Sequence, residues 1–100
     1  MRRRPTALFC ANDELALGAL AALRAHGMQC PRDLSIIGFD DMPAAQYAAP
    51  PLTTIAQPLE NLVRTALEQL LNNIHGLPVR RTSVLPVHLV QRASVAAPSR

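Results

Sequence analysis

The sequence is poor in aromatic residues and has no lysine. Among its 100 residues there are three aromatics, Phe9, Phe39 and Tyr47, and no tryptophan. Proteins that hold single-stranded nucleic acid stack bases on aromatic side chains, so we expect no such surface. Ten arginines against seven acidic residues give a formal net charge of +3. Three of these arginines occupy positions 2–4, so the rest of the chain is nearly neutral and the basic balance is weak evidence for nucleic-acid binding.

Cysteine is also scarce, and long apolar runs are absent. Cys10 and Cys30 are too few for a disulfide framework and have no metal-ligand spacing. Cys10 lies in an apolar run, where we expect a buried, reduced thiol. That run ends at Asn12, short of the roughly 7–15 residues of a signal-peptide core. No run approaches the roughly 20 apolar residues of a membrane-spanning helix, so we expect a cytoplasmic protein without membrane contact.

The motifs of catalysis are missing as well. No serine lies in a Gly-x-Ser-x-Gly elbow, and no glycine-rich loop follows a predicted strand, as phosphate binding would require. His26, His75 and His88 share no spacing and suit surface or helix-end roles. A metal site on Asp40 and Asp41 would need a third ligand that the neighbouring sequence does not supply. We therefore expect no catalytic residues, no metal and no cofactor, and the protein is predicted not to be an enzyme.

The first 40 residues carry the pattern of an α/β fold. Hydrophobic residues make up 49% of the sequence, enough for a core within one domain. The apolar run 7–11 predicts a strand covered on both faces, and 35–39 predicts a second. Between them, apolar residues at helical spacing predict a helix over 13–26, capped by Asn12 and ended by Gly27. A strand, a helix and a strand in this order predict two parallel strands with a right-handed crossover.

The predicted helix over 13–26 has almost no polar face. Leu17 and Ala21 lie off the face formed by Ala16, Leu20 and Leu23. A helix that is apolar on both sides is covered on both sides. The sheet is one cover, and a second subunit is a candidate for the other.

A second helix is predicted over residues 59–74. Apolar residues repeat there at steps of three and four, while Glu60, Arg64 and Glu68 occupy the opposite face. Pro58 suits the first helical position.

The remaining segments read as loops and short strands. Residues 42–51 are predicted to form a loop, and 52–56 a short strand or extended crossing. Residues 83–90 read as a last strand, in which Pro86 favours an edge position or a bulge. Residues 93–100 are expected to be frayed.

Two polar side chains follow the two predicted parallel strands. Asn12 comes directly after the first strand and Asp40 after the second, so both lie at the edge where open α/β folds bind ligands. An amide donates and accepts hydrogen bonds and a carboxylate accepts them, which suits a sugar or a nucleoside. Alternatively, Asn12 is only a helix cap and Asp40 part of a solvated turn. Asp13 and Asp41 are alternative candidates for this ligand contact, but we expect each of them to face solvent or to serve a helix end.

Four ordered motifs resemble the lactose-repressor (LacI/GalR) family. They are residues 5–20 (PTALFCANDELALGAL), 30–41 (CPRDLSIIGFDD), 50–58 (PPLTTIAQP) and 89–94 (LVQRAS). The resemblance covers roughly residues 4–95 and corresponds to the family's C-terminal effector-binding portion. It implies the parallel-sheet portion of a periplasmic-binding-protein-like (type I) domain, in which two α/β lobes clamp a small ligand.

The resemblance also assigns roles to single residues. Asn12 and Asp40 match positions that contact the effector in the family. Gln57 matches a polar ligand contact of related sugar-binding proteins, although it also reads as a residue that leads into the helix after Pro58.

Further positions match other surfaces of the family. Leu17, Ala21 and Tyr47 match surfaces used for dimerisation, so the resemblance implies a homodimer. Leu59 lines the cleft in some relatives, although its helical phase fits a core position equally well.

Several parts of the family pattern are absent from residues 1–100. The helix-turn-helix, the hinge, the N-terminal lobe and the first half of the C-terminal lobe have no counterpart here, so we expect a truncated chain holding part of an effector-binding domain. The helix over 59–74 resembles one that packs on the N-terminal lobe, and its apolar stripe is therefore expected to be exposed or covered by a substitute. We expect the isolated chain to bind neither operator DNA nor effector tightly.

These observations predict a segment of a DNA-binding transcriptional regulator. It would supply effector binding and dimerisation to a repressor that responds to a sugar or nucleoside-like ligand, and it would reach DNA only through the missing N-terminal domain. The alternative is a fragment of a periplasmic sugar-binding protein of an ABC import system. Such proteins share the fold, and the resemblance to them includes the positions of Asn12, Asp40 and Gln57.

Overall fold

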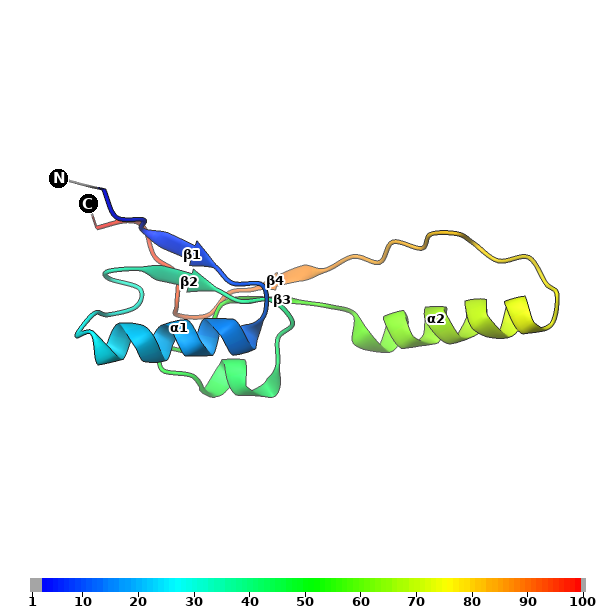
Figure 1. Cartoon of the computed structure of the whole chain (residues 1–100), viewed down its shortest axis with the longest axis horizontal. Helices are drawn as coiled ribbons and strands as arrows, with labels where there is room; N and C mark the ends of the chain where they lie inside the picture. Colours follow the sequence, from blue (N-terminus) through cyan, green and yellow to red (C-terminus); the bar gives the residue numbers. More distant parts are fainter. Residues whose placement is uncertain (1–2, 100) are drawn as a thin grey trace. The chain divides into compact units, whose positions relative to one another are not determined.

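The computed structural model describes residues 3–99. Along the chain it forms β1 (Ala7–Phe9), α1 (Asp13–Ala25), β2 (Ser35–Ile37), the 3₁₀ helix η1 (Pro43–Tyr47), β3 (Thr54–Ala56), α2 (Leu59–Ile74) and β4 (His88–Val90) (Figure 1). The chain divides into two compact units. Unit 1 comprises the described parts of Met1–Ala56 and His88–Arg100, and unit 2 is Gln57–Val87.

Unit 1 is built on the predicted strand–helix–strand element. β1 and β2 are parallel, with Ala7 opposite Ser35 and Phe9 opposite Ile37. α1 connects them and runs alongside the two strands (Figure 1). Ala16 and Leu20 of α1 pack with Ile36 of β2 in the core. The predicted parallel pairing is therefore confirmed.

Local signals set the ends of α1 as the sequence indicated. The side-chain oxygen of Asn12 accepts a hydrogen bond from the backbone N–H of Leu15 at 2.8 Å, which caps the helix. After the C-cap His26, Gly27 has a φ of +70°, a conformation that glycine adopts without steric cost. The Asn12 cap and the Gly27 stop are both confirmed.

The burial predicted for β1 is wrong. All three residues of β1 are exposed, and the side chain of Phe9 is 64% exposed. Side chains alternate between the two faces of a strand, so the exposure of all three shows that neither face of β1 is covered within residues 3–99; β1 is also an edge of its two-stranded sheet. Leu15 of α1 is exposed as well, so the second cover expected for this helix does not come from the described chain.

A third extended segment joins the sheet through isolated bridges. Ile37 pairs with Thr53 and Asp40 with Ala56, both in parallel orientation, while β3 pairs antiparallel with β4. The loop predicted between β2 and β3 contains η1, which begins at a proline and contributes the buried Ala45 to the core. The last strand is shorter than predicted and covers only His88–Val90. Pro86 lacks a backbone N–H, which explains why the pairing does not extend further back.

The C-terminal segment is ordered, and the prediction that residues 93–100 fray is wrong for its described part, up to residue 99. The buried hydroxyl of Ser94 donates to the carbonyl of Ile36 and accepts the N–H of Thr53 at 2.9 Å. The Ser94 carbonyl accepts the N–H of Ile36 at 2.9 Å. Further along, Ala96 exchanges hydrogen bonds with the Ser35 hydroxyl. The tail thus joins β2 to the segment that leads into β3.

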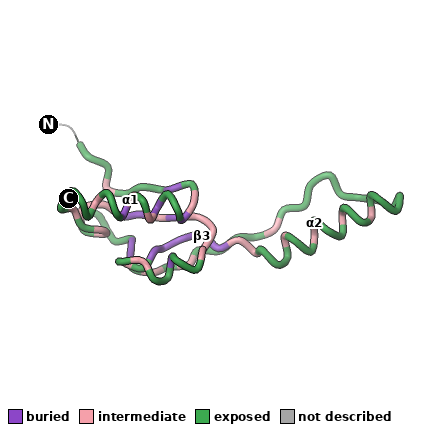
Figure 2. The backbone as a smooth tube through the Cα atoms, turned by 60° about the horizontal axis from the view of Figure 1, so that its bottom comes forward, coloured by how far each residue is buried: buried purple, intermediate pink, exposed green. Residues whose placement is uncertain are grey.

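Unit 2 contains α2 over the predicted residues, but none of its residues is buried (Figure 2). Pro58 was predicted at the first helical position, but it stands one position earlier, at the N-cap, and the helix begins at Leu59. Glu60 and Arg64 form an exposed ion pair at 3.0 Å, and the backbone N–H of Arg80 donates to the side chain of Gln69 at 2.7 Å. The apolar stripe from Leu59 to Ile74 is exposed, as expected from the sequence.

We predict that Ser94→Ala lowers the free energy of unfolding of unit 1 by about 1–3 kcal/mol, because it leaves the buried N–H of Thr53 without its partner. Urea denaturation followed by circular dichroism measures this change. Ser83→Ala is the matched control, since Ser83 is exposed. Equal stabilities of the two variants would contradict the role of Ser94.

Candidate functional site

The carboxyl ends of β1 and β2 form one edge of unit 1. The backbone N–H of Cys10 donates to the carbonyl of Ile37 at 2.8 Å, and the N–H of Asp13 donates to the carbonyl of Phe39 at 3.0 Å. The second bond joins the residue after Asn12 to the residue before Asp40. The backbone therefore brings Asn12 and Asp40 to the same edge of the sheet.

Asn12 serves as a helix cap at this edge. Its side-chain oxygen is used in the bond to Leu15, whereas its amide group carries two N–H donors that this bond does not use. Asn12 is half-buried. The alternative that Asn12 caps the helix is thus confirmed, and the cap does not use the two N–H donors of its side-chain amide. A ligand contact at Asn12 stays a prediction.

Asp40 and Asp41 form a sharp turn after β2. Their φ angles are +123° and +59°, in a region that residues other than glycine rarely adopt. The backbone N–H of Asp40 donates to the carbonyl of Ile55 at 2.8 Å. Such a conformation costs of order 1–3 kcal/mol per residue, so the surrounding contacts must hold it in place.

Arg92 supplies the strongest of these contacts. Its guanidinium donates to the Asp41 carboxylate at 2.8 Å and to the carbonyl of Leu52 at 2.9 Å. Its backbone N–H donates to the hydroxyl of Thr53 at 2.9 Å. Asp41 is therefore engaged in a half-buried ion pair, which is worth more than an exposed pair because water screens it less. The sequence did not indicate this pair.

Asp13 lies in the first turn of α1, in agreement with the expected position at a helix end. The alternative that it faces solvent is wrong, because its side chain is fully buried. Its carboxylate accepts hydrogen bonds from the hydroxyl of Thr54 at 2.6 Å and from the N–H of Met42 at 2.7 Å. Gly38 makes room for it, because a Cβ at that position would lie 2.2 Å from a carboxylate oxygen. Asp13 thus ties the start of α1 to the turn after β2 and to β3.

Gln57 and Leu59 belong to unit 2, whereas Asn12 and Asp40 belong to unit 1. The carbonyl of Gln57 accepts the N–H of Leu59 at 2.9 Å, which fits the alternative that Gln57 leads into α2. Leu59 is 59% exposed, so the alternative that it occupies a core position is wrong. The role of Gln57 as a ligand contact stays a prediction.

The three residues assigned to dimerisation differ in burial. Leu17 is half-buried and packs against the core of unit 1, whereas Ala21 is exposed and Tyr47 is 81% exposed. A tyrosine this exposed has most of its ring available for contact with another protein. Their role in dimerisation also stays a prediction.

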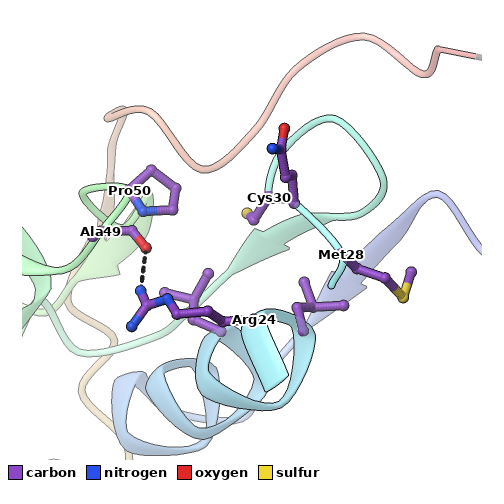
Figure 3. Close-up of a pocket in the computed structure, with 8 residues that line it drawn as sticks. Arg24, Met28, Cys30, Ala49 and Pro50 are labelled. Atoms are coloured by element: carbon purple, nitrogen blue, oxygen red, sulfur yellow. Dashed lines mark hydrogen bonds between the residues drawn. The ribbon is translucent and has the colours of Figure 1, made fainter. Parts of the chain in front are cut away.

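A hollow of about 220 Å³ lies at the other end of α1 (Figure 3). Arg24 points across it and donates to the carbonyl of Ala49 at 3.0 Å, and Cys30 contributes to the wall. The volume is below the roughly 300–1,000 Å³ of small-molecule pockets, and Asn12 and Asp40 are not among its lining residues. Burial raises the pKa values of the Cys30 and Cys10 thiols, and both cysteines are free, which confirms the prediction for Cys10.

Residues 3–99 contain neither a candidate membrane-spanning helix nor a candidate metal-binding cluster. No helix in this part of the chain has the length and apolarity to cross a membrane. Within the same residues, no group of three or more histidine, cysteine, aspartate or glutamate side chains is placed to hold a metal ion.

Comparisons with known proteins define the class of this chain. The chain belongs to the family of periplasmic binding protein-like domains, whose model matches residues 1–95. It is 45% identical over 93 residues to the ribose operon repressor of Haemophilus influenzae. The matched region covers 92% of this chain and 28% of that repressor. It is 46% identical over 96 residues to the transcriptional repressor PurR of Vibrio cholerae, covering 95% of the chain and 29% of PurR.

A solved structure agrees with these relatives. The lac repressor dimer bound to operator and the anti-inducer ONPF superposes with a TM-score of 0.86 at 40% identity, over 93% of this chain and 32% of that chain. The resemblance to the LacI family and the periplasmic-binding-protein-like fold are thereby confirmed. The chain spans less than a third of the length of the curated relatives it matches.

We predict that Asp13→Asn lowers the free energy of unfolding by about 2–3 kcal/mol, because an amide cannot accept both hydrogen bonds as a carboxylate does. Thermal or urea unfolding measures the loss. The adjacent Glu14→Gln is the control, since Glu14 is exposed and also lies in the first turn of α1. A loss of the same size in both variants would indicate a general charge effect at the helix start and not a specific role of Asp13.

Proposed function

We propose that this chain is the C-terminal effector-binding and dimerisation segment of a LacI-type transcriptional repressor. The observation that carries the proposal is the sheet edge that follows β1 and β2. There the backbone hydrogen bond from Asp13 to Phe39 joins the residue after Asn12 to the residue before Asp40. In this proposal residues 1–100 are part of an effector-binding domain, and Asn12, Asp40 and Gln57 contact the effector.

The chemistry of the edge suits a sugar or nucleoside-like effector. The Asn12 amide donates hydrogen bonds and the Asp40 carboxylate accepts them, so the pair complements a ligand rich in hydroxyl groups. The Arg92–Asp41 ion pair holds the turn that presents Asp40. A turn held in one conformation does not have to be ordered when the ligand binds, which favours affinity.

The partners in this proposal follow from the exposed surfaces and from the relatives. A homodimer forms through Leu17, Ala21 and Tyr47, and the described lac repressor structure is itself a dimer on its operator. DNA is contacted only by an N-terminal domain of the full-length protein, which operates in the cytoplasm. No catalytic step is assigned to the chain, in line with relatives that are named repressors.

The alternative is a fragment of a periplasmic sugar-binding protein of an ABC import system. The fold is compatible with it, because the matching family model is named for periplasmic binding proteins. The relatives favour the repressor, and so do the apolar residues that α1 leaves exposed. A monomeric transport receptor has no partner to cover such residues, and exposed apolar patches on soluble monomers are small.

The proposal is tested by sequencing the source genome upstream of the Met1 codon and translating it in frame. We expect a continuous frame that encodes a helix-turn-helix followed by a second α/β lobe. A continuous frame that begins with a secretory signal would establish the transport receptor instead. A stop codon directly upstream would refute the proposal, because the chain would then be made without a DNA-binding domain.

We predict that dimerisation shields Tyr47, which is the single tyrosine in a chain without tryptophan. Acrylamide should quench its fluorescence less as the protein concentration rises. In Ala21→Glu the quenching should stay constant, because a buried charge opposes the association. Concentration-independent quenching in the unmodified chain would exclude Tyr47 from a dimer interface.

A further inference from the structure

The turn after β2 contains two consecutive aspartates that both have unusual backbone conformations. The φ angles of Asp40 and Asp41 are +123° and +59°, a region that glycine adopts freely and other residues rarely adopt. Both residues are half-buried. Relaxation of this turn to negative φ angles would relieve the backbone strain, so contacts outside the turn must oppose it.

Asp41 is held at its backbone and at its carboxylate. Its N–H group donates to the hydroxyl of the buried Thr54 at 3.4 Å. Its carboxylate accepts a hydrogen bond from the guanidinium of Arg92 at 2.8 Å, and the side chains of Arg92 and Asp41 are 20% and 28% exposed. Charge-assisted hydrogen bonds are about twice as strong as neutral ones. The ion pair is therefore the stronger of the two contacts.

Arg92 is fixed by contacts that do not involve Asp41. A second guanidinium nitrogen donates to the carbonyl of Leu52 at 2.9 Å, and the backbone N–H of Arg92 donates to the hydroxyl of Thr53 at 2.9 Å. Leu52 and Thr53 are both buried. Because the guanidinium is a rigid fork with its donors in a set geometry, these bonds keep a positive charge in place beside Asp41.

The turn is tied to other elements on both sides of Asp41. Before it, the backbone N–H of Asp40 donates to the carbonyl of Ile55 at 2.8 Å. After it, the backbone N–H of Met42 donates to the buried carboxylate of Asp13 at 2.7 Å. A change of φ at Asp41 would rotate these two residues relative to each other, so both hydrogen bonds depend on the conformation of Asp41.

We propose that Arg92 is a positioning residue of the candidate site. Acting through Asp41, it offsets the backbone strain of the turn and thereby keeps Asp40 at the sheet edge that follows β1 and β2. In this division of roles Asp41 serves the conformation of the site and Asp40 serves the ligand. The inference rests on the proposed function in one respect, the assignment of Asp40 as an effector contact. The effect of Arg92 on the turn does not depend on that assignment.

Amide hydrogen exchange by NMR on the full 100-residue chain tests this role and needs no ligand. The amides of Asp40 and Met42 report on the turn, because both are hydrogen-bonded, at 2.8 and 2.7 Å. The amide of Ile36 reports on the core, since Ile36 is fully buried and its N–H donates to the carbonyl of Ser94 at 2.9 Å. Each result is expressed as a protection factor, the intrinsic exchange rate divided by the measured rate. This ratio removes the direct effect of a substitution on the chemistry of neighbouring amides.

Arg92→Ala should lower the protection of Asp40 and Met42 about tenfold, because the turn opens more often without its strongest contact. The protection of Ile36 should change by less than about threefold. Arg64→Ala is the matched control, since Arg64 also pairs with a carboxylate, but on the exposed surface of unit 2, and it should leave all three amides unchanged. Unchanged protection of the turn in Arg92→Ala would overturn the proposal. An equal loss at all three amides would also overturn it, because Arg92 would then stabilise unit 1 as a whole.

A glycine at position 41 separates the positioning role from the other contacts of Arg92. Glycine adopts a φ of +59° without steric cost, so Asp41→Gly alone should keep the protection of Asp40 and Met42 within about threefold of the unmodified chain. In the Asp41→Gly background, Arg92→Ala should lower this protection by less than about twofold, because the pair that it breaks is already absent. A loss of about tenfold in both backgrounds would overturn the proposal, because Arg92 would then act through its other bonds. A loss of about tenfold in Asp41→Gly alone would do so as well, because relief of the strain would then not replace the ion pair.

The test of the proposed function has a separate outcome. A stop codon directly upstream of the Met1 codon would refute the repressor segment and leave these exchange results as they are. A turn that is insensitive to Arg92→Ala would refute the positioning role and leave the upstream coding sequence as it is.

Discussion

The buried carboxylate of Asp13 is the contact on which the arrangement of unit 1 depends. Removing a carboxylate from water is unfavourable unless donors replace the lost hydration. The Thr54 hydroxyl and the Met42 N–H do so, and Gly38 leaves the space. Among the described residues no buried side-chain nitrogen or oxygen lacks a hydrogen-bond partner. The start of α1, the turn after β2 and the strand β3 therefore meet at the Asp13 carboxylate, and its hydrogen bonds fix their relative positions.

The same contacts link stability to the candidate site. Asp13 lies between the cap residue Asn12 and the rest of α1, and the turn that it holds through Met42 begins with Asp40 and Asp41. Arg92 holds that turn from the other side through Asp41. Positive φ angles at two consecutive aspartates are costly, and these contacts offset the cost. The conformation of Asp40 is thus set by the core and the ion pair together.

Local features of the fold could be predicted from the sequence, and long-range ones could not. The bounds of α2 and the Asn12 cap follow from residues within a few positions of one another. The bonds of Asp13 to Thr54 and of Ser94 to Thr53 each join residues 41 positions apart, and no spacing in the sequence indicates them. The burial of β1 was mispredicted for a related reason, because burial depends on which other segments lie beside the strand.

The division into two units indicates where this chain holds its structure by itself. Isolated helices shorter than about 12–15 residues are marginal in water, and longer ones draw most of their stability from packing. α2 has 16 residues, buries none of them and gains one exposed ion pair, which contributes at most about 0.5 kcal/mol. Unit 1 instead contains a buried core and a saturated polar network. The edge with Asn12 and Asp40 therefore depends on contacts within unit 1, and loss of helical structure in α2 would leave those contacts in place.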